Sequence, residues 1–338
     1  MGRILAVLVL LAVIVAGAFE WETFNFSAPE PAARNGKETV LLIKPGDGIK
    51  AISEKLEAAG VVKHALLFQI GVRWRQATGK LKAGEYAIPS RASMRDIMAI
   101  FIAGKAIEHK LTAAEGLTSD MIARLINADP VLQGPPVAVP EEGTLLPETY
   151  LFMRGDTRQQ IVARMRKAQK QVIARLWPKR DADLPYTTVR EAIILASIVE
   201  KETSLPAERR HIAAIFVNRL RTGMKLQSDP TIIYSITGGY PLGRGIRASE
   251  LARVTPYNSY AVAGLPPTPI CNPGKDSIDA VLNPGTSKDL YFVASGSGGH
   301  YFSATIADQT RHVAELRARE RLQKTAKPAI PVPATPHL

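Results

Sequence analysis

The segment Thr188–Thr203, TVREAIILASIVEKET, decides how the larger part of this chain is interpreted. Thr188 followed three residues later by Glu191 is the pattern of a capping box, which predicts that a helix begins here. Residues 192–199 are apolar with one exception, and a helix that is apolar on all sides is normally buried. The segment therefore predicts a buried helix that ends in the three charged residues 200–202.

Glu200 is the candidate catalytic residue of this helix. Helical geometry places it on the same side as the apolar Ile193, whereas Glu202 points to the opposite side. A carboxyl group at the end of a buried helix is partly desolvated, which raises its pKa, as a general acid near neutral pH requires. The alternative is structural, because Glu200 could instead pair with Arg209 or Arg219 and tie two helices together. The residues alone leave both interpretations open.

The composition predicts a folded protein of about two domains. The chain has 338 residues, of which 46% are hydrophobic and 22% are charged, and these values exclude a largely disordered chain. The single Cys271 excludes an intrachain disulfide and a cysteine-based metal site, and the six histidines form no HExxH pair, so no cofactor is expected. The net charge of +12 suggests an anionic neighbour such as nucleic acid, phospholipid or acidic glycopeptide.

The N-terminus contains an uncharged run from residue 4 to residue 19. As a helix it would be about 24 Å long, and Trp21 and Phe24 could extend it toward the thickness of a bilayer core, about 30 Å. Arg3 precedes the run and acidic residues follow it, so the positive-inside rule predicts that the rest of the chain is exported. The alternative is a signal peptide cleaved near Ala18. Export makes nucleic acid an improbable partner.

The remaining pattern predicts an α+β fold with an N-terminal transmembrane helix, a small module and a larger mixed α/β catalytic domain. Residues 39–43 and 84–88 have strand character, and helices are expected around 49–59 and 65–76 and from Ser93. The expected segments are a cytoplasmic N-terminus 1–3, an anchor 4–21, a tether 22–38, the small module 39–104, the larger domain 105–322 and a disordered tail 323–338. The basic helix 161–176 is interpreted as a solvated face, or alternatively as a contact with anionic lipid or glycan.

Several ordered motifs resemble the endolytic murein transglycosylases, the YceG-like family. The resemblance runs from about Thr39 to Leu316. The motifs that carry it include Ala196–Thr203, Arg219–Tyr234, Thr255–Tyr260, Gly264–Pro267, Asn272–Gly274, Leu81–Tyr86 and Glu142–Tyr150.

This resemblance implies a single-pass protein of the cell inner membrane with its catalytic domain in the periplasm and a LysM-like module at 39–104. It also implies that Glu200 catalyses cleavage of the MurNAc–GlcNAc bond in nascent peptidoglycan strands. The products would carry 1,6-anhydroMurNAc ends, and the cut would terminate glycan elongation. Peptidoglycan synthases (penicillin-binding proteins) are the implied protein partners.

Polar residues in the neighbouring motifs are candidates for substrate binding: Gln227, Tyr234, Asn258 and Tyr260. Each of them could equally be a structural group beneath a loop. Asp229 is a candidate second carboxylate, although Asp229-Pro230 also fits the start of a helix. Two alternative functions therefore stay open: a muramidase-type hydrolase with a second carboxylate, and a non-catalytic scaffold that binds peptidoglycan.

Overall fold

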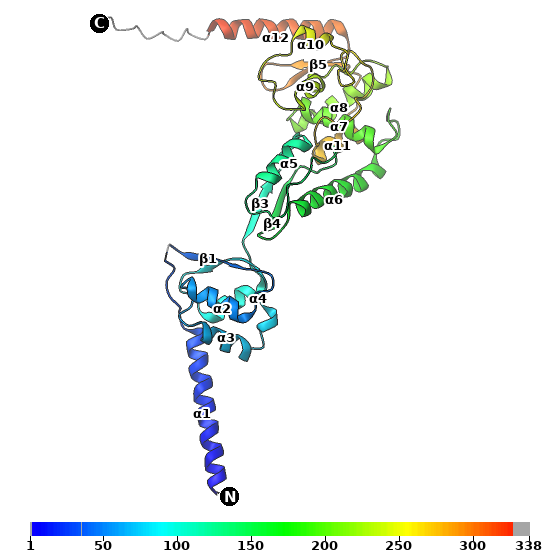
Figure 1. Ribbon diagram of the computed structural model, residues 1–338. Coiled ribbons are helices and arrows are strands. Elements are labelled where there is room, and N and C mark those ends of the chain that lie inside the picture. The colour runs from blue at the N-terminus through cyan, green and yellow to red at the C-terminus, as the bar shows by residue number, and fades with distance from the viewer. Residues whose placement is uncertain (1, 35, 327–338) are drawn as a thin grey trace, which may run out of the picture. The chain divides into compact units, whose positions relative to one another are not determined.

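The computed structural model describes residues 2–34 and 36–326, and in this part of the chain helices predominate and the strands pair in twos (Figure 1). The helices are α1 Gly2–Ser27, α2 Ile49–Ala58, α3 Ala65–Trp74, α4 Met94–Ala103, α5 Ser119–Ala128, α6 Arg158–Leu176, α7 Val189–Glu202, α8 Pro206–Arg221, α9 Asp229–Thr237, α10 Ala248–Ala252, α11 Lys275–Leu282 and α12 Ile306–Ala326. The strands are β1 Glu38–Ile43, β2 Gly84–Pro89, β3 Glu108–Thr112, β4 Thr149–Met153, β5 Tyr291–Ala294 and β6 His300–Ser303. Single 3-10 turns occupy Thr78–Lys80 and Trp177–Lys179.

The chain forms two compact units. The smaller unit contains the residues up to Leu111 together with the short segments Pro130–Gln133 and Leu151–Thr157. The larger unit contains Thr112–Asp129, Gly134–Tyr150 and the chain from Arg158 onward.

The smaller unit has an antiparallel ribbon covered by helices. β1 pairs with β2 in a register that sets Val40 opposite Ala87, and the apolar faces of α2, α3 and α4 pack against the ribbon around Tyr86. Ser93 closes a capping box with Asp96 at the start of α4, because each residue's side chain bonds the other's main-chain N–H. The strands expected at 39–43 and 84–88 and the helix start expected at Ser93 are confirmed.

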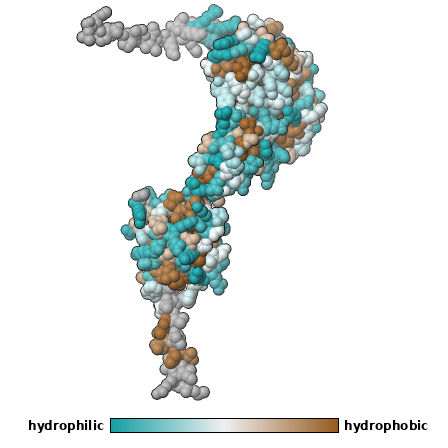
Figure 2. Space-filling view, in the orientation of Figure 1, coloured by the Kyte–Doolittle hydropathy of each residue, from teal (hydrophilic) through white to brown (hydrophobic). Residues whose placement is uncertain are grey.

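The expected transmembrane helix over residues 4–21 is wrong, and so is the inner-membrane location that depended on it. Across residues 2–34 and 36–326, no helix combines the length and the apolar character that crossing a bilayer demands. α1 contains the uncharged run, but that run has a rise of only about 24 Å against a hydrocarbon core of about 30 Å, and Glu20 follows it directly. Hydrophobic side chains are nevertheless exposed along this helix, among them Val9 and Val13 (Figure 2).

The end of α1 belongs to the core of the smaller unit. Phe26 is buried, stacks on Phe68 with ring centroids 6.2 Å apart, and carries the guanidinium of Arg75 over its other face. Glu30 is also buried and accepts a hydrogen bond from the Lys63 N–H. The start of the segment expected as a tether over 22–38 is therefore packed against the unit, because an aromatic side chain anchors it. The LysM-like character of 39–104 stays a prediction.

The core of the larger unit is the contact between α7, α8 and α11 (Figure 1). Eight consecutive residues of α7, 192–199, are buried, as the sequence pattern predicts. α6 packs one face against this core and leaves five of its basic residues exposed: Arg164, Arg166, Lys167, Lys170 and Arg175. Of the tail expected over 323–338, residues 323–326 form the end of α12, and the remainder lies outside the described residues, as does Met1 of the expected N-terminal segment.

Candidate active site

The start of α7 is fixed by the predicted capping box. The Glu191 N–H donates to Thr188 Oγ1 at 3.2 Å, and the Thr188 N–H donates to Glu191 Oε2 at 2.9 Å. Both orphan donors at the helix start are thereby satisfied. Since the middle of the helix is buried on all sides, its last turn delivers Glu200 to a defined position.

The Glu200 carboxyl group is half-buried and is held by the main chain of another element. The Gly274 N–H, at the N-cap of α11, donates to Glu200 Oε2 at 2.8 Å. Within the described part of the chain, Oε1 has no hydrogen-bond partner, and it is not among the buried unpaired atoms. One oxygen is therefore fixed by a main-chain N–H, and the other is partly accessible to solvent.

Neither arginine of the structural alternative pairs with Glu200 in the described part of the chain. Arg209 is buried and lies with Nη1 at 3.6 Å from Asp276 Oδ2. Arg219 donates through Nε to the Leu290 carbonyl at 2.6 Å and through Nη1 to the Leu226 carbonyl. The two guanidinium groups are thus engaged elsewhere, and within the described residues neither forms an ion pair with Glu200.

The side chain of Glu115 lies close to that of Glu200. A Cβ atom placed on Gly274 would lie 1.8 Å from Glu115 Oε1. Because Gly274 has no side chain, the carboxyl groups of Glu115 and Glu200 can both lie next to its main chain. Partial burial and then the negative charge of Glu200 raise the pKa of Glu115. Glu115 also lines a cavity of about 580 Å³ together with Glu148, Arg175 and Lys275.

Glu202 faces a different environment, as its helical position predicts. Ser228 Oγ donates to Glu202 Oε1 at 2.5 Å. Burial, opposed in part by this hydrogen bond and assisted by the charge of Asp229, raises the pKa of Glu202 to about 7. The sequence gives no direct signal of this raised pKa, because Ser228 lies 26 residues further along the chain.

Two of the four expected substrate-binding residues, Gln227 and Tyr260, lie together on the Glu202 side. Gln227 is exposed with φ +51°, and its N–H donates to the Ser259 carbonyl at 3.1 Å. The Tyr260 hydroxyl donates to Asp229 Oδ1 at 2.6 Å. Asp229 is the first residue of α9 and Ser228 is its N-cap, so the helix begins one residue earlier than Asp229-Pro230 suggested.

The other two expected residues face the protein interior. Among the described residues, the amide group of the buried Asn258 bonds main-chain groups only: its Nδ2 donates to the Leu251 and Arg253 carbonyls, and its Oδ1 accepts from the Tyr260 N–H. This geometry matches the structural alternative. The hydroxyl of Tyr234 donates to Glu142 Oε2 at 3.3 Å.

Glu142 and Asn272 form a buried network that had no role assigned from the sequence. Glu142 Oε1 accepts from the Ser119 N–H at 2.8 Å and from Asn272 Nδ2 at 3.0 Å. The Asn272 carbonyl accepts from the Gly116 N–H at 3.1 Å. Because Asn272 lies two residues before Gly274, the network holds the amide that binds Glu200. The only signal in the sequence is that Glu142 and Asn272 both lie in motifs of the resemblance.

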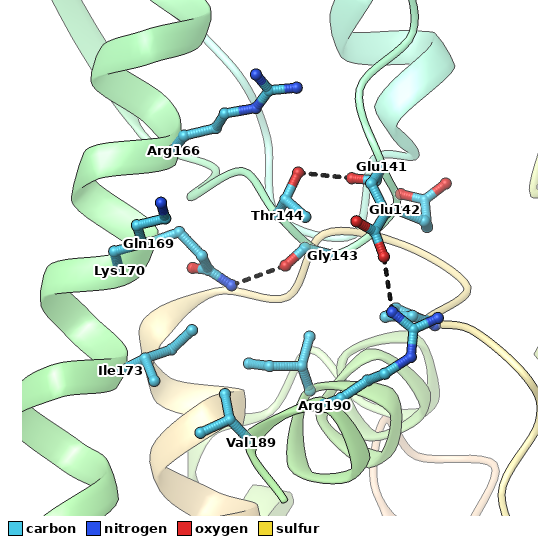
Figure 3. Close-up of a pocket in the computed structure, with 12 residues that line it drawn as sticks. Glu141, Glu142, Gly143, Thr144, Arg166, Gln169, Lys170, Ile173, Val189 and Arg190 are labelled. Atoms are coloured by element: carbon cyan, nitrogen blue, oxygen red, sulfur yellow. Dashed lines mark hydrogen bonds and ion pairs between the residues drawn. The ribbon is translucent and has the colours of Figure 1, made fainter.

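A cavity of about 590 Å³ lies between α6, the loop 141–144 and the start of α7 (Figure 3). Val189 and Ile193, two of its apolar lining residues, share the side of α7 that carries Glu200. In the described part of the chain, no group of three or more His, Cys, Asp or Glu side chains is arranged to hold a metal ion.

The chain belongs to the YceG-like family, whose model matches residues 41–315, so the resemblance drawn from the motifs is confirmed. Proteins named endolytic murein transglycosylase from two Streptococcus pneumoniae strains are 29% identical over 361 residues, which cover 92% of this chain and 64% of theirs. The Bacillus subtilis protein of the same name is 28% identical and covers 88% of this chain and 89% of its own. The crystal structure of a YceG-like protein from Listeria monocytogenes is 30% identical, matches with a TM-score of 0.50, and covers 82% of this chain and 99% of that one.

Proposed function

We propose that this chain is an endolytic murein transglycosylase and that Glu200 is its catalytic residue. The proposal rests on one observation: Glu200 presents one oxygen to the Gly274 N–H and leaves the other without a partner in the described part of the chain. The names of the Streptococcus pneumoniae and Bacillus subtilis relatives support the same activity, and the chain spans 64% of the length of the former.

The proposed reaction needs a single carboxyl group. Protonated Glu200 donates its proton to the glycosidic oxygen between MurNAc and GlcNAc, and the bond from that oxygen to C1 of MurNAc breaks. The carboxylate then removes the proton from the C6 hydroxyl of the same MurNAc, and the C6 oxygen closes on C1 as a 1,6-anhydro ring. No water is consumed, so the second carboxylate that a glycoside hydrolase places about 5–9.5 Å from the first is not required.

We retain Gln227 and Tyr260 only as contacts with sugars further along the strand, because both lie beside Ser228 and Asp229 on the Glu202 side of α7 and not beside Glu200. Tyr234 is assigned to support Glu142, and Asn258 is assigned to support the loop that carries Tyr260. Termination of glycan elongation, with peptidoglycan synthases as partners, extends the proposal, and co-purification of a synthase with this chain tests the partnership.

The test uses uncrosslinked glycan strands and mass analysis of the products. The parent chain should release ends that are lighter than reducing ends by one water, and Glu200→Gln should reduce the rate at least about a hundredfold. Glu315→Gln, which alters an exposed carboxyl on α12, is the control and should cleave at the parental rate. Reducing ends would assign a muramidase instead. An unchanged rate for Glu200→Gln would refute the catalytic role, and binding without cleavage by the parent would favour the scaffold.

A further inference from the structure

The cavity of about 580 Å³ that Glu115 lines lies within the larger unit. Its walls are residues 112–115, residues 146–149, the last turns of α6 and the first residue of α11. Leu146, Pro147 and Val172 contribute apolar surface to it. Apolar surface with a few polar groups at fixed positions is typical of a site for a small ligand or for one unit of a polymer.

Four charged side chains line this cavity, and their formal charges cancel. The carboxylates of Glu115 and Glu148 are matched by the cations of Arg175 and Lys275, and all four residues are exposed. Within the described part of the chain, none of these four side chains forms an ion pair or a hydrogen bond. Carboxylates accept hydrogen bonds, whereas guanidinium and ammonium groups donate them, so the set suits a neutral ligand that has both donors and acceptors.

Glu115 connects this cavity with Glu200. Glu115 Oε1 lies 1.8 Å from the position of a Cβ on Gly274, and the Gly274 N–H donates to Glu200 Oε2 at 2.8 Å. With backbone bond lengths of about 1.5 Å, these two carboxyl oxygens are at most about 8 Å apart. The neighbouring Gly116 also follows the end of α7, because a Cβ placed on it would lie 3.7 Å from Glu200 Cγ. A strand bound at Glu200 can therefore place a neighbouring sugar in this cavity.

The balance of charge in the cavity distinguishes between the two sugars of the cleaved bond. MurNAc carries an acidic peptide, whereas GlcNAc is neutral and offers hydroxyl groups and an acetamido group. A lining of two carboxylates and two cations gives no net attraction to an acidic sugar. The same lining can accept hydrogen bonds from the hydroxyl groups of GlcNAc and donate hydrogen bonds to its oxygens. The cavity therefore favours GlcNAc.

We propose that this cavity binds the GlcNAc of the bond that Glu200 cleaves, and that Glu115 is a substrate-binding residue that accepts hydrogen bonds from the hydroxyl groups of this sugar. The inference rests on the proposed transglycosylase activity and adds the place of the sugar that leaves. GlcNAc contributes the glycosidic oxygen that takes the proton of Glu200, so a contact with Glu115 holds that oxygen on the Gly274 side of the catalytic carboxyl.

The test measures the binding of a neutral GlcNAc trimer to the whole chain by isothermal titration calorimetry, so its readout does not depend on cleavage. Glu115→Ala and Arg175→Ala each remove one charged side chain from the cavity, one on either side of it. Glu315→Ala and Arg317→Ala are the matched controls, because each removes an exposed charge of the same sign on α12 that lines none of the cavities described above.

We expect each cavity variant to raise the Kd of the trimer about tenfold and both controls to match the parent. The trimer should also inhibit cleavage of uncrosslinked strands by the parent competitively. A parental Kd in both cavity variants, an equal loss in the controls, or no binding of the trimer by the parent would overturn the inference. A lower kcat of Glu115→Ala at an unchanged Kd would overturn it too, because Glu115 would then act only through Gly274. Failure of the parent to cleave strands would instead overturn the proposed function.

Discussion

Replacing Glu202 with glutamine should remove a pH dependence of stability that this half-buried carboxyl creates. The pKa of Glu202 is about 7 in the folded chain against an ordinary value of 4.5. A raised acid pKa means that the folded state binds the proton more tightly, so this stabilisation is fully present below pH 4.5 and is lost as the pH rises through 7. The difference of about 2.5 pKa units corresponds to about 3 kcal/mol, taken as an upper bound.

Glutamine keeps the size of the side chain and an oxygen that accepts the Ser228 hydroxyl, but it cannot ionise. At pH 5 the Glu202→Gln variant and the parent should differ by less than about 1 kcal/mol, whereas at pH 8 the variant should be more stable by up to about 3 kcal/mol. Urea unfolding of both chains at pH 5, 6, 7 and 8 measures this difference. Glu315→Gln, at an exposed position, is the control and should follow the parent. A Glu202→Gln variant that retains the parental slope between pH 5 and pH 8 would show that Glu202 is not held neutral by burial.

Two glycines give further predictions. Gly245→Ala is the control for both, because a new Cβ there would meet no atom within 4 Å. Gly274→Ala places a Cβ at 1.8 Å from Glu115 Oε1, so Glu115 must move and the bond to Glu200 is disturbed. We expect kcat to fall about tenfold with Tm almost unchanged, and a parental kcat would contradict the role of the Gly274 amide. Gly143→Ala forces a side chain at φ +77° and sets its Cβ 2.6 Å from Pro269 Cγ. Gly143→Ala should lower the free energy of unfolding by about 2–3 kcal/mol and Tm by roughly 5–10 °C in thermal unfolding. An unchanged Tm would refute the predicted clash.

The sequence predicts those parts of the structure that local patterns determine. The capping box at Thr188 and the buried run that follows are confirmed because both depend on residues within a few positions of one another. Local patterns could not predict the hydrogen-bond partners of Glu200 and Glu202. Gly274 and Ser228 reach the helix through the packing of α11 and α9 against α7.

The error over residues 4–21 has the same physical origin. Hydropathy alone made these residues a transmembrane helix, whereas α1 continues to Ser27 and its Phe26 packs into the core of the smaller unit. For Asn258 the sequence left two interpretations open, sugar binding and a structural group beneath a loop, because polarity alone does not determine burial. The structure buries Asn258 and directs its amide to main-chain groups of the loop, and its role stays a prediction.

The two carboxyl groups at the end of α7 have different surroundings, and only those of Glu200 fit the proposed chemistry. They are two residues apart, so the helix turns them about 200° from each other and gives them separate surroundings. Glu202 is half-buried and accepts a hydrogen bond from Ser228, and there it serves the contact between α7 and α9. In the described part of the chain Glu200 is held by one main-chain N–H, which fixes its position without an ion pair that would have to break before the carboxylate takes up a proton. A carboxyl that must donate a proton and then take one back needs that arrangement, because an arginine partner would favour one protonation state throughout the cycle.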